Sequence, residues 1–196
     1  AEDVAEVGLL EGGIGLFTHG ITRDVELDAA AHVLHGGEAG LAHDALEQFL
    51  QSEDIDTQLA ILKSLAKDLL DKMPYTKSVT HVGTTAEQAF AMAAGVCQDH
   101  THVFLALLRD KGIAARYVSG YIYEATQAHM ASHAWAEVWL AGNWYTFDIS
   151  NQHFTPNSHV YIAFGRDYAD AAPVRGVRTG GGDERLYSQV MVSTSP

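Results

Sequence analysis

The sequence predicts an α+β domain in which helices come first along the chain and an antiparallel sheet follows. Apolar residues recur at helical spacing between residues 52 and 74 and again between 96 and 111. After residue 115 the chain changes to segments rich in aromatic and β-branched residues, separated by turn signals. Helices followed by consecutive strands are typical of α+β proteins, whose helices pack against a sheet.

The first long helix is predicted to begin near Ser52 and to end before Pro74. Ser52 or Asp54 can cap its start, because a side-chain oxygen there accepts from a free backbone N–H group. Pro74 cannot continue a helix. The apolar face consists of Ile55, Leu59, Leu62, Leu65, Ala66 and Leu69.

Two more helices are predicted before the sheet. Thr85 followed by Gln88 is a capping-box pattern, which predicts a short helix ending near Met92. Gly95 breaks that helix, and another is predicted from Val96 to Lys111. The apolar stripe of this last helix consists of Val103, Phe104, Leu107 and Leu108.

The strands follow these helices. They are predicted at Ala115–Tyr123, Ser132–Leu140, Trp144–Ile149, Val160–Phe164 and Leu186–Val192. Gly142-Asn143, between the second and third strands, predicts a two-residue hairpin turn that pairs Glu137 with Asp148.

Charge and cysteine content exclude several classes of function. Twelve Lys and Arg residues against twenty-five Asp and Glu residues give a net charge of −13, so we expect neither nucleic acid nor a membrane surface as a partner. No apolar run approaches the roughly 18–20 residues of a membrane-spanning helix. One cysteine excludes an intrachain disulfide and any multi-cysteine metal site, and it favours a reducing, cytoplasmic location.

Cys97 is the first candidate functional residue. It follows Gly95 and opens an apolar helix, so its sulfur is expected at a helix N-terminus. Free N–H groups and the positive end of the helix dipole favour a thiolate there. The alternative is a buried cysteine that acts only as a small hydrophobic residue.

A nucleophilic thiol needs a base, usually a histidine held by a third group. His133 lies in a strongly alternating strand and shares a face with Trp135 and Glu137. The predicted hairpin register places Asp148 on that same face, as an orienting carboxylate requires. The same register leaves Asp148 too near the turn for direct contact with His133, unless the strand bulges or bends.

These residues lie in motifs that resemble the bacterial transglutaminase-like superfamily, whose members are described as candidate cysteine proteases. The matching segments are Gly95–Asp99 (GVCQD), Arg109–Gly120 (RDKGIAARYVSG), Ser132–Val138 (SHAWAEV) and Phe147-Asp148. The resemblance implies a papain-like α+β core, in which the nucleophile helix packs on an antiparallel sheet. It also implies that Cys97 is the nucleophile, His133 the base and Asp148 its partner.

The chain departs from the family pattern at two points. Family members commonly have Asp-Pro-Thr-Asn at the third catalytic position, whereas this chain has Asp148-Ile149-Ser150-Asn151. Papain-like enzymes carry a glutamine oxyanion donor six residues before the nucleophile, where this chain has Ala91. The backbone N–H of Cys97 can supply one oxyanion donor, and Tyr121 is a candidate for the second.

The family also implies a β-rich domain before the catalytic one. Residues 1–45 are rich in glycine and are predicted to form an irregular or β-rich segment, the end of a truncated domain. Residues 46–196 are predicted to form the transglutaminase-like catalytic domain.

The sequence therefore predicts an enzyme that performs thiol-dependent amide chemistry through a thioester, without a cofactor or metal. Its expected substrate is a protein or peptide with a carboxamide or peptide bond, and the acceptor is water or an amine. The alternative from another class is a catalytically silent fold that binds peptides or assists assembly.

A metal-dependent hydrolase is the third hypothesis. His100 and His102 follow Cys97 closely, and His133 could complete a Cys/His set. Positions 97 and 100 are neighbours on a helix, but position 102 points away, and the usual paired-ligand spacing of zinc sites is missing. The sequence therefore favours thiol chemistry over metal chemistry.

Overall fold

The computed structural model describes residues 40–123, 131–173 and 190–192. The helices in these ranges are α2 (Gly40–Gln51), α3 (Ile55–Lys72), α4 (Ala86–Met92), α5 (Cys97–Asp110) and α6 (Tyr168–Ala171). The strands are β1 (Ala115–Ile122), β2 (His133–Leu140), β3 (Asn143–Phe147) and β4 (His159–Gly165). The predicted α+β class is confirmed. None of the described helices is both long and apolar enough to cross a membrane.

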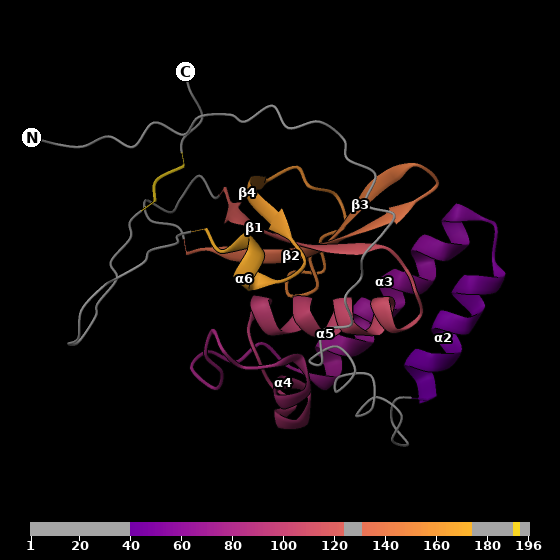
Figure 1. Cartoon of the computed structure of the whole chain (residues 1–196), viewed down its shortest axis with the longest axis horizontal. Coiled ribbons are helices and arrows are strands. Elements are labelled where there is room, and N and C mark those ends of the chain that lie inside the picture. The colour runs from indigo at the N-terminus through magenta and orange to yellow at the C-terminus, as the bar shows by residue number, and fades with distance from the viewer. Residues whose placement is uncertain (1–39, 124–130, 174–189, 193–196) are drawn as a thin grey trace, which may run out of the picture.

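The strands form one antiparallel sheet in the order β3-β2-β1-β4 (Figure 1). Helix α5 runs across one face of this sheet and packs against β2 and β1. Helices α3 and α4 pack against α5, and α2 packs against α3. The nucleophile helix of the family pattern is thus held between the sheet and the other helices.

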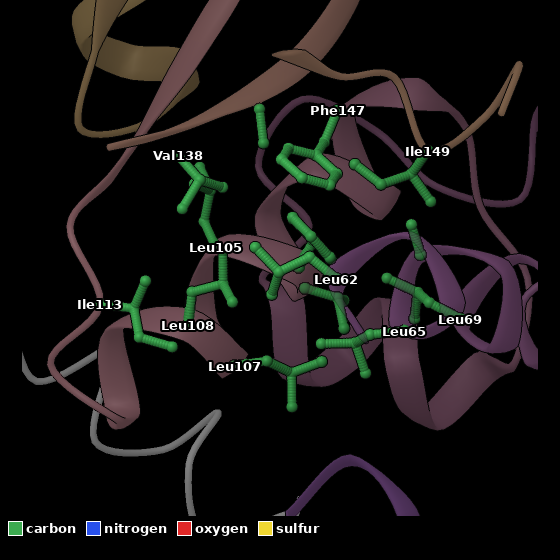
Figure 2. Packing of buried hydrophobic residues seen from close by; sticks show 14 of the residues in the cluster. Leu62, Leu65, Leu69, Leu105, Leu107, Leu108, Ile113, Val138, Phe147 and Ile149 are labelled. Atoms are coloured by element: carbon green, nitrogen blue, oxygen red, sulfur yellow. The ribbon is translucent and has the colours of Figure 1, made fainter. Parts of the chain in front are cut away.

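The hydrophobic core fills the space between α5, α3 and the sheet (Figure 2). Each large apolar side chain that is fully buried contributes about 1.5–3 kcal/mol to folding. This packing fixes the position of α5, and with it the position of the first residue of that helix. The labelled members are Leu62, Leu65, Leu69, Leu105, Leu107, Leu108, Ile113, Val138, Phe147 and Ile149.

The helix starts agree with the predicted caps. Asp54 caps α3, because its carboxylate accepts from the Thr57 N–H at 2.9 Å. Thr85 and Gln88 form the predicted capping box on α4, with hydrogen bonds of 3.2 and 3.0 Å between each side chain and the other residue's N–H. Local hydrogen bonds therefore set both helix starts.

The hairpin between β2 and β3 turns one residue earlier than predicted. Leu140 pairs with Asn143, so the turn residues are Ala141 and Gly142. Their φ angles are 45° and 85°. Two positive φ angles suit the right-handed twist of a hairpin, and alanine adopts them less readily than asparagine, which is why the sequence favoured the later turn.

The earlier turn changes the register of β3 along β2. The expected pairing of Glu137 with Asp148 is wrong, because Glu137 pairs with Thr146. Continued by two residues, the observed register places Asp148 opposite Trp135, about 7 Å closer to the start of β2. The face is unchanged, because the shift is an even number of residues.

The structure differs from the prediction at the first described residues. Residues 40–45, predicted as irregular or β-rich, belong to α2, so the predicted boundary after residue 45 falls inside a helix. Leu46 and Phe49 explain the helix, because both are buried in the core. Residues 1–39 lie outside the described residues. So do residues 186–189 of the predicted last strand, and residues 190–192 of it are not in a strand.

Gly120 lies where the pairing of β1 with β4 shifts its register. A Cβ atom at Gly120 would overlap the carbonyl oxygen of Val160 and lie 2.8 Å from the Trp135 ring. We therefore expect Gly120→Ala to lower the free energy of unfolding by about 2–3 kcal/mol, because the backbone can move away only by breaking the β1–β4 pairing. Urea denaturation measures the change. Gly83→Ala is the control, since its Cβ would meet only ordinary contacts at 3.4 Å. Equal stability of the two variants would contradict the prediction.

Candidate active site

Cys97 is the first residue of α5 and is half-buried. The start of this helix is fixed by Asp99, whose Oδ2 accepts from the Val96 N–H at 2.8 Å and from the Thr80 hydroxyl at 2.7 Å. A Cβ atom at Gly95 would lie 2.7 Å from the Asp99 side chain, so only glycine leaves room for this carboxylate. Asp99 therefore caps the helix and holds the backbone that carries the thiol.

The structure brings the three predicted site residues together. His133 opens β2, and Asp148 follows the last residue of β3. The Nε2 atom of His133 lies 2.8 Å from Oδ2 of Asp148, and the Cys97 side chain is near enough to the His133 ring to raise its pKa. With Nε2 on Asp148, the other ring nitrogen, Nδ1, is the one left for the thiol. No bulge in β2 is needed for this contact, because the earlier hairpin turn provides it.

The charge of His133 follows from these contacts. Burial alone would lower the pKa of His133, but the hydrogen bonds to Asp148 and then to Cys97 outweigh it and raise the pKa to about 9. The ring is therefore an imidazolium at neutral pH. An imidazolium beside Cys97 is placed to give a proton to a group that leaves from the thiol side of the site.

Asp148 is fully buried and saturated with donors. Its Oδ2 accepts from His133, from His159 Nε2 at 3.1 Å and from Asn151 Nδ2 at 2.9 Å. Its Oδ1 accepts from the Asn151 backbone N–H at 3.1 Å. Burial favours the protonated carboxyl, yet the hydrogen bonds from His133, His159 and Asn151 hold the pKa of Asp148 well below its usual range. The carboxylate is thus ionised and fixed in one orientation.

His100 connects the nucleophile helix to the loop after Asp148. Its Nδ1 lies 2.8 Å from the Ser150 hydroxyl, and its Nε2 donates to the Met73 carbonyl oxygen at 2.7 Å. Burial lowers the pKa of His100. A neutral ring can accept from Ser150 while it donates to Met73. Ser150, which stands where family members commonly have threonine, therefore has a hydrogen-bond partner in His100.

The Cys/His zinc set is not formed. Both ring nitrogens of His100 are engaged, and His102 accepts from the Tyr168 N–H at 3.2 Å, beside α6. In the part of the chain that the structure describes, the potential ligands of one metal ion are His133, Asp148 and His159, whose ligand atoms lie within 4.8 Å of one another. These atoms already hydrogen-bond to each other, so a metal ion would have to displace the contacts that orient His133.

Two residues of this site were missed by the sequence analysis as donors to Asp148. Asn151 follows Asp148 by three residues, so the Asp-x-x-Asn spacing of the family pattern is a local signal for it. His159 comes from a different strand, and no local spacing points to it.

Two tyrosines bear on the second oxyanion donor. Tyr121, the candidate from the sequence, is buried in β1. Tyr75 is another tyrosine near the thiol. Burial raises its pKa, and its interaction with Cys97 raises it further, which keeps the hydroxyl protonated.

Comparisons with known proteins identify similar sequences and a similar fold. Residues 47–149, which contain all three site residues, match the model of the transglutaminase-like superfamily. An uncharacterized protein of Mycobacterium leprae is 36% identical over 117 residues, which are 57% of this chain and 42% of that protein. One of Mycobacterium tuberculosis is 32% identical over 129 residues, or 60% of this chain and 41% of that protein. The chain thus spans about two fifths of the length of these relatives.

A solved structure shares the fold. It is described as a candidate cysteine protease from Cytophaga hutchinsonii, with 28% sequence identity and a TM-score of 0.56. The similarity covers 78% of this chain and 51% of that one. Together with the family match across more than half of the residues, this similarity shows that the chain belongs to the transglutaminase-like superfamily.

Proposed function

We propose that this chain catalyses thiol-dependent amide chemistry, with Cys97 as nucleophile, His133 as acid and base, and Asp148 as the orienting carboxylate. The observation that carries the proposal is the convergence of the three side chains: His133 lies 2.8 Å from Asp148, and Cys97 interacts with the His133 ring. The family and the similarity to a candidate cysteine protease support it. The substrate is a protein or peptide with a carboxamide or peptide bond.

The first half-reaction forms a thioester. The Cys97 thiolate attacks the carbonyl carbon, and the electron pair of the C=O bond moves to oxygen. The Cys97 backbone N–H is placed at a helix start, where it is free to stabilise the oxyanion. When the oxyanion collapses, the C–N bond breaks, and the His133 imidazolium gives its proton to the leaving amine.

The second half-reaction releases the acyl group. Neutral His133 takes a proton from the acceptor, which is water or an amine, while the acceptor attacks the thioester carbonyl. The C–S bond breaks, and the thiolate and imidazolium return. Water gives hydrolysis and an amine gives transamidation, with every earlier step in common. A cytoplasmic location, expected from the single cysteine, stays a prediction.

The test combines a labelled primary amine with a glutamine-containing protein, alongside a water-only arm that measures ammonia and new peptide termini. We expect thiol alkylation by iodoacetamide to abolish the reaction and EDTA to leave it unchanged, because the proposed chemistry uses no metal. Mass spectrometry locates the alkylated residue and the site of any incorporated amine. Loss of activity on chelation, restored by zinc, would contradict the thiol mechanism and favour a metal-dependent hydrolase. A folded protein without turnover in either arm would favour a peptide-binding module.

A further inference from the structure

His159 reaches the site from the opposite edge of the sheet. It opens β4, where it pairs with Ile122 of β1, and its side chain is fully buried. Its Nε2 atom lies 3.1 Å from Oδ2 of Asp148, the same oxygen that receives His133 at 2.8 Å. One carboxylate oxygen is therefore shared by histidines from two strands.

One indole contacts both imidazole rings, whose centroids lie 6.3 Å apart. The fully buried Trp135 ring lies edge-on to the His159 ring, with 4.7 Å between centroids at 81°. The Trp135 ring also stacks with the His133 ring, with 6.1 Å between ring centroids and 27° between ring planes. Trp135 thus limits the rotation of both rings, and both keep Nε2 directed at Asp148.

Burying the polar side chain of His159 costs free energy, which its hydrogen bond to Asp148 offsets. Among the described residues, its Nδ1 atom is buried with no hydrogen-bond partner. An unpaired buried polar atom costs free energy, whereas a leucine of similar size would fill this space without that cost. The hydrogen bond from Nε2 to Asp148 therefore explains why this position holds an imidazole and not an apolar side chain.

We propose that His159 is a positioning residue that acts through Asp148. By donating to Oδ2 it fixes the rotation of the carboxylate and favours its ionised form. The fixed carboxylate in turn holds His133 with Nε2 toward Asp148 and Nδ1 toward Cys97. The catalytic meaning of this role rests on the proposed function, but the effect on the charge of His133 is measurable without any substrate.

The pH dependence involves every titratable group near Asp148. These are His133 from β2, His159 from β4, His100 from α5 and His153 from the turn after β3, with Cys97 coupled through His133. Removing the His159 donor leaves Asp148 ionised but frees its carboxylate to rotate, so the hydrogen bond that holds the His133 imidazolium weakens. The His133 titration should therefore move from about 9 toward lower pH.

The experiment compares three variants of the whole chain. His159→Gln keeps an N–H donor at about the reach of Nε2, and His159→Leu keeps the volume without a donor. His153→Leu is the matched control, because the exposed His153 side chain contacts the His159 ring but makes its hydrogen bonds to Asp148 through the backbone, so this variant alters packing at His159 without removing a donor. NMR follows the His133 ring from pH 4 to 10, kinetics give kcat and KM, and thermal unfolding gives the Tm.

We expect His159→Leu to lower the His133 inflection by up to about one pH unit, because a carboxylate that rotates holds the imidazolium less tightly. Its kcat should fall by roughly 10–100-fold with little change in KM. His159→Gln should recover most of both effects, and His153→Leu should resemble the unmutated chain. If His159→Leu does not fold, His159→Asn replaces it, since its shorter amide cannot reach Asp148.

The proposal would be overturned if His159→Leu and His159→Gln changed the Tm alike and did not differ from each other in His133 titration or kcat. It would mean that His159 is a packing residue only. The NMR titration also separates this proposal from the proposed function. A shifted His133 inflection in a protein without amide turnover would support the positioning role. It would count only against the proposed amide chemistry.

Discussion

Replacement of Cys97 by alanine is expected to reduce amide turnover by roughly 10⁴-fold or more while the protein stays folded, because no other group can form the thioester. The fold should tolerate the change. Cys97 is half-buried at a helix start, and alanine is a good helix former. Steady-state kinetics with an amide substrate measure the loss, and circular dichroism with thermal unfolding measures the fold.

The control for this prediction is Gln98→Ala, one residue further along α5. Gln98 donates to the Val82 carbonyl oxygen at 3.1 Å, so its loss disturbs the same helix start without removing the thiol. This variant should keep most of the turnover. Retained activity in a folded Cys97→Ala protein would exclude a covalent thioester on this residue.

Asp148→Asn is the second change with a large expected effect. The carboxylate accepts from His133, His159 and Asn151, and an amide offers one acceptor oxygen and places an NH₂ group against donors. We expect kcat to fall by about 10³–10⁴-fold, because His133 loses its orientation. His133→Ala should cost still more, because it removes the group that carries the proton.

The same variant tests the pH dependence of stability. The pKa of Asp148 is lowered in the folded protein, so its ionised form stabilises the fold above the unfolded value of 3.8. That contribution is lost as the pH falls through the folded pKa. Urea denaturation between pH 2 and 6 should therefore show the unmutated chain losing its advantage over Asp148→Asn toward acid. A constant difference across this range would mean that Asp148 is not the group responsible.

The sequence predicted the elements whose causes are local. The caps at Asp54 and Thr85 and the apolar stripes of α3 and α5 depend on neighbours within one or two helical turns. Helix α2 was missed, because Leu46 and Phe49 follow a glycine-rich stretch that masked a short helical pattern. The hairpin turn was misplaced by one residue because Ala141 adopts a positive φ that its residue type disfavours.

The sequence proposed the identities of the candidate site residues but not their contacts. Cys97, His133 and Asp148 were found from motifs, and the shared face of His133 and Asp148 came from strand alternation. Their closeness depends on the hairpin register, which the sequence left open. His159 could not be found, because its contact joins β4 to the end of β3 and depends on the order of strands in the sheet.

The short connection between β2 and β3 also sets how this chain can change in length. One added residue in the turn at Ala141-Gly142 would slide the pairing by one position and direct the Asp148 side chain to the opposite face of the sheet. Two added residues would restore both the face and the pairing, because each strand gains one residue and Leu140 pairs with Asn143 again. The single insertion touches no site residue, yet it would separate Asp148 from His133. Insertions at this turn are therefore tolerated in pairs, and relatives that keep the contact between His133 and Asp148 should differ in turn length by even numbers of residues.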